Sequence, residues 1–194
     1  MTLSKQIVAG VDEVGRGSLF GPVFAGAVIL NKFHKSLLVD SGLKDSKKLS
    51  SRKISELAPL IQENSEAWAI GEASASEIDA IGIRAATESA MIRALKRLPQ
   101  NPDLVLVDGA LLIKEWEGKQ INLIKGDSKS VCIAAASVIA KESRDSVIKE
   151  LSSEYPEYGL NTNVGYGTKF HRESLKRYGP SKLHRLSFLN KIIV

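Results

Sequence analysis

Four carboxylates lie where the chain leaves an apolar segment or enters a turn, and their positions suit chemistry. They are Asp12, Glu13, Asp108 and Asp127. An ionised carboxylate at the edge of a protein core is costly unless it is paired or binds a metal. Oxygen ligands without accompanying Cys or His residues suit a hard cation such as Mg²⁺ or Mn²⁺. Two such cations about 4 Å apart promote phosphoryl transfer, because they activate water and stabilise the leaving oxygen.

Other interpretations of these acids stay open at this point. Asp127 precedes a long helical pattern, so it also suits a helix N-terminus. Adjacent side chains of a regular strand point to opposite faces, so Asp12 and Glu13 reach one site only if the strand ends or bulges there. A glycosidase would also use two carboxylates, but the lysine-rich surroundings favour a phosphate substrate.

Other catalytic signatures are absent from the sequence. It has no phosphate-binding loop ending in Lys and Ser or Thr, no paired-cysteine motif and no HExxH. The three histidines, His34, His171 and His184, are dispersed. We interpret them as surface or hydrogen-bonded residues rather than metal ligands.

The positive charge is concentrated near the C-terminus. The 194 residues carry a formal net charge of +5, and residues 168–194 hold seven Lys or Arg and one acid, Glu173. A basic segment of this kind favours a polyanionic partner, although a solvated basic tail has the same composition.

Length and composition predict one globular domain, and we expect it to be a monomer. Cys132 is the only cysteine, so no internal disulfide forms and a reducing compartment, the cytoplasm, is expected. We interpret it as a buried structural thiol. The N-terminus lacks a signal-peptide pattern. The longest apolar run, residues 23–30, is too short to cross a bilayer.

The elements that must position the acids begin with a hairpin. Two apolar runs, residues 7–11 and 23–30, are joined by a glycine-rich connection. Further strands are expected at residues 67–73, 103–107 and 120–124. Helices are expected at residues 51–64, 83–98, 131–151 and 168–178.

Some local expectations are specific enough to be checked. Residues 31–48 are expected to form a loop, and Pro59 to kink or end its helix. Ser76 or Asp79 is expected to cap the helical region that includes residues 83–98. A hairpin followed by alternating helices and strands predicts an α/β fold, a mixed sheet with helices packed on it.

The segment DEVGRGSLFGPV, residues 12–23, resembles ribonuclease HII. Further segments are similar to blocks of that family, in the same order: LKDSKKLS (43–50), LVDG (106–109), KGDSKS (125–130), IAAASVIAKESRD (133–145), GYGTKFH (165–171) and HRLSF (184–188). The resemblance spans nearly the whole chain. It implies a ribonuclease H-like fold for residues 1–194, with a small basic helical lobe at about residues 155–194 that grips the substrate.

The resemblance also implies an activity. Members of this family are metal-dependent endonucleases that cut RNA in RNA–DNA hybrids and duplex DNA with embedded ribonucleotides. Cleavage on the 5′ side of a ribonucleotide by metal-activated water leaves 3′-hydroxyl and 5′-phosphate ends. Mg²⁺ or Mn²⁺ is the implied cofactor. Asp12 and Asp108 would bridge or flank the metals, with Glu13 and Asp127 completing the site. Asp145 is the weaker candidate for the fourth acid and is interpreted as a structural ion-pair residue.

Substrate contacts follow from the same resemblance. Residues Gly15, Arg16 and Gly17 match the family's GRG loop, which reads the 2′-hydroxyl at the RNA–DNA junction. Tyr166 matches the tyrosine that stacks on the following deoxyribose, and Lys47 and Lys48 are candidates for phosphate contacts. Taken alone, GRG is also a plain turn, Tyr166 a core anchor, and the lysines solvated side chains.

Two departures from the family's pattern stand out. Val164 occupies a place where members often have lysine, and the chain ends soon after residue 188. Both predict weaker substrate affinity. The type HIII enzymes have a different loop in place of GRG, which places the resemblance with type HII. The rival hypotheses are a non-catalytic nucleic-acid-binding module and a DNA nuclease or resolvase of the same fold.

Overall fold

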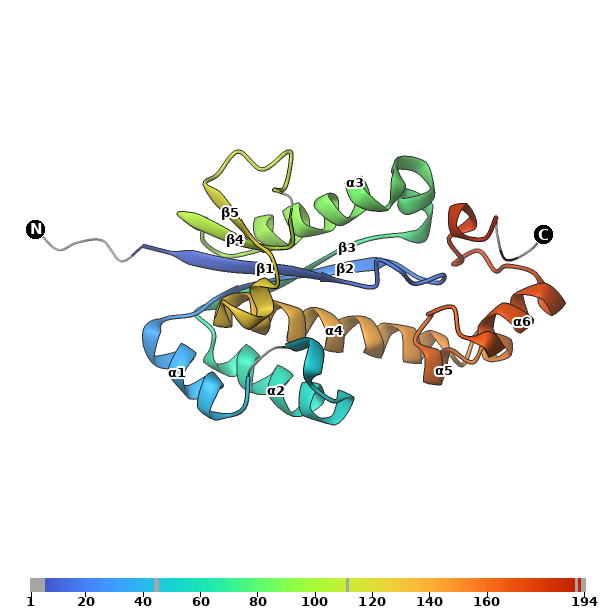
Figure 1. The fold of residues 1–194 in the computed structure, drawn as a ribbon, viewed down its shortest axis with the longest axis horizontal. Coiled ribbons are helices and arrows are strands. Elements are labelled where there is room, and N and C mark those ends of the chain that lie inside the picture. Colours follow the sequence, from blue (N-terminus) through green and yellow to red (C-terminus); the bar gives the residue numbers. More distant parts are fainter. Residues whose placement is uncertain (1–5, 44–45, 111, 191, 193–194) are drawn as a thin grey trace, which may run out of the picture.

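The fold is a mixed five-stranded sheet with helices on both faces (Figure 1). The computed structural model describes residues 6–43, 46–110, 112–190 and 192, apart from the side chain of Lys47. The strands are β1 (Val8–Val14), β2 (Val23–Ile29), β3 (Ala67–Ala73), β4 (Leu104–Asp108) and β5 (Gln120–Leu123). Their order across the sheet is β3-β2-β1-β4-β5.

The predicted hairpin is confirmed. β1 and β2 pair antiparallel, with Ala9 opposite Ile29 and Val14 opposite Phe24. β2 also pairs antiparallel with β3, whereas β1, β4 and β5 run parallel. The C-terminal ends of the three parallel strands therefore meet at one edge, where ligand sites of α/β sheets are found.

Two long helices cover opposite faces of the sheet (Figure 1). The helices are α1 (Lys32–Asp40), α2 (Ser51–Asn64), α3 (Ala75–Lys96), α4 (Val131–Leu151), α5 (Leu160–Asn163) and α6 (Lys169–Tyr178). α3 packs on β2 and β3, and α4 packs on β1 and β2, with α2 outside it. No helix in the described residues has the length and apolar character needed to span a membrane.

Glycines in the sheet let these helices approach the backbone closely. A Cβ atom added to Gly10 of β1 would lie 2.3 Å from the carbonyl carbon of Cys132, and one added to Gly26 would lie 2.4 Å from the oxygen of Ala136. α4 is therefore in backbone contact with the sheet, which its run of small residues permits. Cys132 is buried, and burial raises the pKa of its thiol, as expected of a structural residue.

A separate apolar cluster supports the C-terminal elements. It joins Phe20, which follows β1, to Ile148 near the end of α4 and to Leu175 of α6. The short 3-10 helix η3 (Pro156–Tyr158) contributes Tyr158 to the same cluster. Residues following α4 thus pack against the connection between β1 and β2.

The structure corrects three local predictions. Residues 32–40 form α1 rather than a loop, because Asn31 caps the helix through the His34 amide at 2.8 Å and Leu38 is buried. α2 continues through Pro59, since its face of Ile54, Leu57, Ala58 and Ile61 is held in the core. α3 begins after Ser74, in a capping box with Glu77, and bends at Gly82, which has φ 82°.

Candidate active site

Asp12 and Asp108 lie beside each other at the edge where the parallel strands end. β1 and β4 are paired in register up to Val11 and Val107, so the two aspartates come next on neighbouring strands. Side chains at matching positions of parallel strands share a face. Gly10, two residues before Asp12, faces α4, so both aspartates point to the α4 side of the sheet. Asp12 is 1% exposed and Asp108 is 9% exposed.

Asp127 is brought to the same corner by the short 3-10 helix η2 (Gly126–Ser128). The amide of Gly126 donates to Asp108 Oδ1 at 2.6 Å. Asp127 is buried, and its Oδ2 accepts from the hydroxyl of Ser46 at 3.1 Å. The N-cap of α4 is Ser130, so the alternative role of Asp127 as that helix's cap is wrong.

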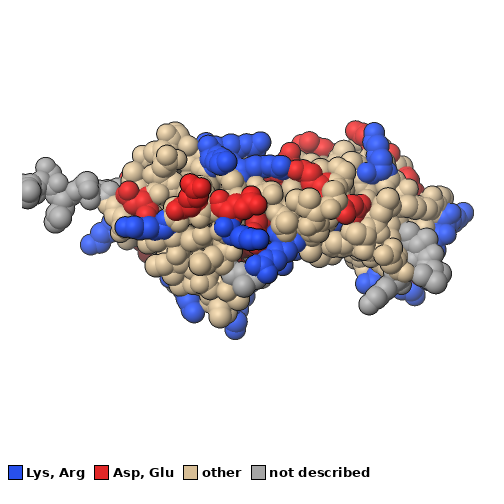
Figure 2. Space-filling view, turned by 90° about the horizontal axis from the view of Figure 1, so that it is seen from above, with Lys and Arg blue, Asp and Glu red and all other residues tan. Residues whose placement is uncertain are grey.

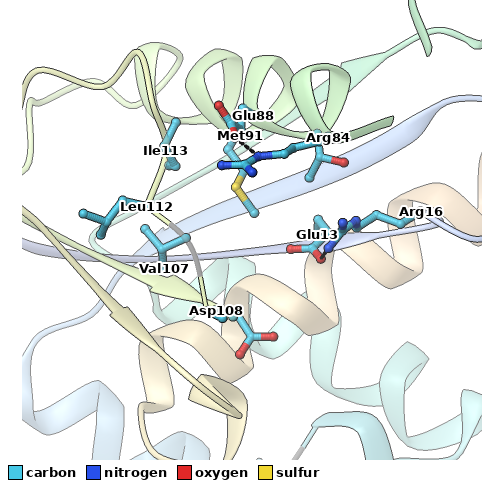
Figure 3. Close-up of a pocket in the computed structure, with 12 residues that line it drawn as sticks. Glu13, Arg16, Arg84, Glu88, Met91, Val107, Asp108, Leu112 and Ile113 are labelled. Atoms are coloured by element: carbon cyan, nitrogen blue, oxygen red, sulfur yellow. Dashed lines mark hydrogen bonds and ion pairs between the residues drawn. The ribbon is translucent and has the colours of Figure 1, made fainter. Parts of the chain in front are cut away.

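Glu13 occupies the other side of the same edge. Its pairing with Ala25 is regular, so β1 does not bulge there, and its pairing with β4 has already stopped at Val11. Glu13 lines a pocket of about 190 Å³ together with Asp108 (Figure 3). From the sequence, Glu13 was expected to reach the same site as Asp12 only if β1 ended or bulged there. β1 instead continues regularly to Val14, and it is the neighbouring strand β4 that ends, at Asp108.

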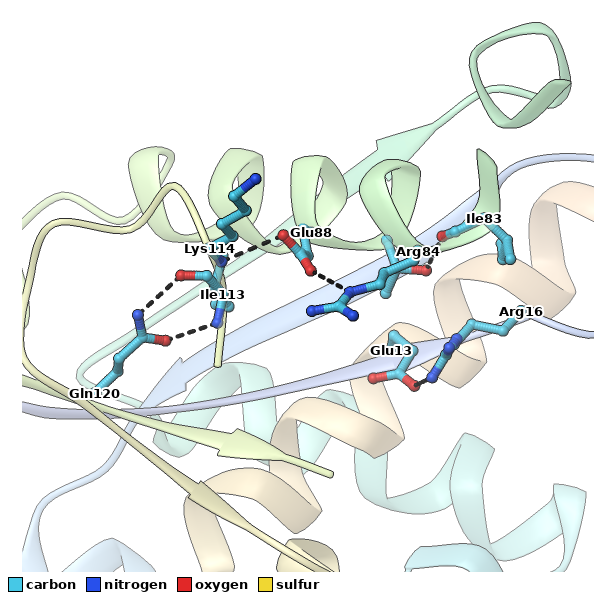
Figure 4. Close-up of polar contacts among 9 residues, drawn as sticks. Glu13, Arg16, Ile83, Arg84, Glu88, Ile113, Lys114 and Gln120 are labelled. Atoms are coloured by element: carbon cyan, nitrogen blue, oxygen red, sulfur yellow. Dashed lines mark hydrogen bonds and ion pairs between the residues drawn. The ribbon is translucent and has the colours of Figure 1, made fainter. Parts of the chain in front are cut away.

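Two arginines line this pocket and are held by ion pairs (Figure 4). Arg16 Nη1 lies 3.3 Å from Glu13 Oε1, and Arg84 Nε on α3 lies 3.1 Å from Glu88 Oε1. Both pairs are partly exposed, so their contribution to stability is small. Their effect is to place positive charge next to the acidic edge.

The donor set fits a hard divalent cation. Three buried aspartates and Glu13 supply only oxygen ligands. Within the described residues, no three Asp, Glu, His or Cys side chains are gathered closely enough to enclose an ion. Mg²⁺ does not require such a cage, because it keeps several waters and uses one or two carboxylates together with substrate phosphates.

The GRG loop, residues 15–17, follows directly after β1. Gly15 has φ 84°, and a Cβ atom there would lie 2.2 Å from Arg144 Nε. A Cβ atom on Gly17 would meet nothing within 4 Å. Gly15 is therefore required by the protein's own structure, whereas Gly17 leaves open space through which a ligand can approach.

Two fully buried arginines donate hydrogen bonds to this loop and to the residues after it. The sequence positions of these arginines did not indicate this role. Arg185 donates from Nη1 to the carbonyl oxygens of Gly15 at 2.7 Å and Arg16 at 3.0 Å. Arg144 donates to the carbonyls of Pro22, Phe20 and Val164 and to the Ser18 hydroxyl. Backbone carbonyls thus accept most of the hydrogen bonds that the two guanidinium groups donate.

Both guanidinium groups are held by hydrogen bonds to uncharged oxygen atoms. No carboxylate of the described residues lies within ion-pair distance of either guanidinium. Burial lowers the pKa of Arg144, and burial together with Arg144 lowers the pKa of Arg185 to about 9. A pKa of about 9 leaves Arg185 charged at neutral pH, so positive potential lies under the GRG loop, which favours an anionic ligand.

Tyr166 lies next to this loop. It lines a second pocket, of about 300 Å³, together with Glu13, Gly15 and Ser46. Its ring centroid is 5.3 Å from Arg144 Cζ and 6.0 Å from Lys141 Nζ. The ring thus faces cations at the pocket wall instead of filling an apolar core.

The remaining residues that the sequence singled out have different surroundings. Asp145 pairs with Lys141 at 2.7 Å, which confirms its interpretation as an ion-pair residue, although Lys141 rather than Arg144 is the partner. Val164 has φ 41° and its carbonyl accepts from Arg144. Lys48 is exposed on the 3-10 helix η1 (Ser46–Lys48), and the Lys47 side chain lies outside the described residues.

Two of the three histidines have a role that their spacing did not reveal. His171 and His184 are buried, and their Nε2 atoms are 3.0 Å apart. On the face of the molecule seen in Figure 2, Lys and Arg side chains are intermixed with Asp and Glu side chains.

A mixed sheet of this topology with carboxylates at the ends of β1 and β4 defines a nuclease of the ribonuclease H-like fold. The chain belongs to the ribonuclease HII family, whose family model, described as Ribonuclease HII, matches residues 9–191. It is thereby a hydrolase, a ribonuclease acting on RNA–DNA hybrids. The hypothesis of a non-catalytic binding module is set aside.

Individual relatives agree with this assignment. The chain is 57% identical to ribonuclease HII of Prochlorococcus marinus (strain NATL1A) over 188 residues, covering 97% of this chain and 96% of the relative. Ribonuclease H2 from Pyrococcus horikoshii OT3 superposes with a TM-score of 0.81 at 29% identity, covering 97% of each chain. Bst-RNase HIII in complex with Mn²⁺ shares the fold, with a TM-score of 0.76 at 22% identity over 97% of this chain and 69% of that one.

Proposed function

We propose that this protein cleaves duplex DNA on the 5′ side of an embedded ribonucleotide, as well as RNA in RNA–DNA hybrids, leaving 3′-hydroxyl and 5′-phosphate ends. The observation that carries the proposal is the register of β1 and β4, which sets Asp12 beside Asp108 next to the GRG loop. An acidic edge and a loop able to approach a sugar are the two parts that this reaction needs. The protein acts as a monomer in the cytoplasm under this proposal.

Asp12, Glu13, Asp108 and Asp127 would hold Mg²⁺ or Mn²⁺. When bound there, divalent cations activate water and stabilise the leaving oxygen of the phosphodiester. The hydrogen bond from Gly126 to Asp108 and that from Ser46 to Asp127 orient two of these carboxylates before any ligand arrives. Such preorganisation avoids reorienting the ligands during the reaction.

Selection of the ribonucleotide is proposed to come from residues 15–17. A site built to bond a hydroxyl disfavours a substrate lacking it, because the polar groups of the site are then left unpaired. The carbonyls of Gly15 and Arg16 are already fixed by Arg185, so the loop conformation does not depend on substrate. Tyr166 would stack on the following deoxyribose, and Lys47 would contact a phosphate.

The C-terminal lobe, about residues 155–194, is proposed to grip the duplex. One surface hollow, directly after Tyr166, is lined by three cations and one acid. They are Lys169, Arg172, Lys176 and Glu173 of α6, together with Gly167. The contacts of the three cations would be with phosphates, which position a duplex without reading its sequence. The departure at Val164 predicts that this grip is weaker than in relatives that have lysine at that place.

The test is cleavage of a DNA duplex bearing one ribonucleotide, compared with an all-DNA duplex, with and without Mg²⁺ or Mn²⁺. We expect metal-dependent cutting of the first duplex only, and loss of cutting in Asp12→Asn. Asp40→Asn, an exposed carboxylate at the end of α1, is the matched control and should cut normally. Equal cutting of both duplexes would remove the proposed hydroxyl selection, and an active Asp12→Asn variant would remove the metal site.

A further inference from the structure

The buried histidine pair lies between α6 and the segment that follows it. His171 is 0% exposed and His184 is 2% exposed, and the Tyr158 ring lies 4.5 Å from the His184 ring. Polar atoms this deep in a protein are almost always hydrogen-bonded. The partners of the four ring nitrogens therefore determine where the protons of the pair reside.

Those partners allow one arrangement of two neutral rings. The Ser181 amide and the Ser181 hydroxyl both lie 2.9 Å from His184 Nδ1. The amide only donates and the hydroxyl can donate as well, so Nδ1 is an acceptor and the proton of His184 is on Nε2. The Tyr166 carbonyl lies 3.0 Å from His171 Nδ1, and a carbonyl only accepts, so that nitrogen carries the proton of His171. His184 Nε2–H then donates to the bare Nε2 of His171 at 3.0 Å.

The result is a hydrogen-bond chain with a single direction, from Ser181 through His184 and His171 to Tyr166. Burial lowers the pKa of both imidazoles, that of His184 to about 4 with a further contribution from His171. Both rings are therefore neutral at working pH. A proton added to the bare nitrogen of either ring would set two donors against each other.

The hydrogen-bond chain ends on the backbone of Tyr166, and its His184 pairs with Phe20 in the segment that follows the GRG loop. The Tyr166 carbonyl also accepts from the Thr168 amide at 2.8 Å. At the other end, His184 forms an isolated bridge with Phe20, three residues after Gly17. The Leu19 amide donates to the Gly165 carbonyl at 2.9 Å, which closes the connection between the two loops.

We propose that His171 and His184 are positioning residues, whose hydrogen-bond chain fixes the Tyr166 backbone relative to residues 15–17. The inference rests on the proposed contact of Tyr166 with substrate. Reacting groups must be held to within a fraction of an ångström for full activity. The pair acts at a distance through Tyr166 and does not itself touch substrate or metal.

The proton arrangement is testable without any variant. Long-range ¹H–¹⁵N correlation spectra of the full chain at pH 7 report which nitrogen of each imidazole is protonated. We expect a slowly exchanging proton on Nδ1 of His171 and on Nε2 of His184. The opposite tautomer of either ring, or a charged ring at pH 7, would overturn the hydrogen-bond chain.

The connection to Tyr166 is tested with two variants of one residue. Asn at position 171 can place its amide where Nδ1 donates, whereas Gln places it where Nε2 lies and leaves the Tyr166 carbonyl without that donor. His171→Gln should lower kcat/KM on the single-ribonucleotide duplex by about fivefold to tenfold, the effect of one lost hydrogen bond, mainly through KM. His171→Asn should stay within about twofold, as should the control His34→Gln.

A double variant distinguishes positioning from a general structural role. If the pair acts through Tyr166, His171→Gln should cause no further loss in a Tyr166→Ala background. Independent, multiplicative losses, or equal damage in the Asn and Gln variants, would overturn the inference and leave the proposed function standing. Normal cleavage by Tyr166→Ala would instead show that the proposed substrate contact is wrong, and the positioning role would fall with it.

Discussion

The guanidinium of Arg185 donates a 2.7 Å hydrogen bond to the carbonyl oxygen of Gly15, 170 positions earlier in the chain. It also donates from Nε to the Gly21 carbonyl at 2.9 Å. Residues from the two ends of the protein thus meet under the GRG loop. The conformation of that loop depends on the Arg185 side chain, which is not part of the loop.

Removing the Arg185 guanidinium should destabilise the fold. Arg185→Met leaves the carbonyls of Gly15, Arg16 and Gly21 without a buried donor, and we expect a loss of about 3 kcal/mol in the free energy of unfolding, measured by urea denaturation. Arg52→Met is the control, because Arg52 is exposed on α2 and pairs with the partly exposed Glu56; its effect should stay below about 0.5 kcal/mol. Equal stability of the two variants would contradict the role given to Arg185.

The two glycines of the GRG loop should respond differently to alanine. Gly15→Ala combines a positive φ with a clash against Arg144, so the free energy of unfolding should fall by on the order of 2 kcal/mol. Gly17→Ala meets open space and should fold with unchanged stability. Under the proposal that the substrate sugar approaches through that space, Gly17→Ala should still lose cleavage of the single-ribonucleotide duplex. A fully active Gly17→Ala would show that the sugar does not approach there.

Stability should depend on pH through the histidine pair. The pKa of His184 is about 4 in the folded protein, against 6.5 for an ordinary histidine. Between these values the unfolded chain binds a proton that the folded protein does not, so stability is complete above pH 6.5 and declines as the pH falls towards 4. The loss across this window is on the order of 3 kcal/mol.

Urea denaturation at several pH values between 7.5 and 4.5 measures this decline. His184→Gln removes the titrating group at position 184, so its stability should fall less steeply over the same range. Carboxylates contribute to both proteins alike, and the difference between the two curves isolates the imidazole. Parallel curves would contradict the assignment of the low pKa to His184.

The acids could be predicted from the sequence because each follows a short apolar run or lies in a turn next to a helix. The ends of strands are encoded locally, and parallel strands bring their ends to one edge. β3, α4 and α6 were predicted closely for a similar reason, since their apolar periodicity and caps are local. The resemblance then indicated which of several possible chemistries the acids serve.

The buried cations and the histidine pair could not be predicted in the same way. Arg144 stands beside Asp145 in the sequence, which suggested an ion pair, yet its side chain turns to the carbonyls of Phe20 and Pro22. His171 and His184 are 13 residues apart, and their rings meet where α6 and the segment after it pack around Tyr158 of η3. α1 was missed because it buries only Leu38, too little for a visible apolar face.

The metal site itself is tested most directly by crystals of the protein soaked in MnCl₂, with anomalous scattering used to locate the ion. We predict a peak within about 2.0–2.4 Å of carboxylate oxygens from both Asp12 and Asp108, and no such peak in crystals of Asp12→Asn. A manganese peak confined to another part of the molecule, in crystals of a protein that still cleaves with Mn²⁺, would contradict the account.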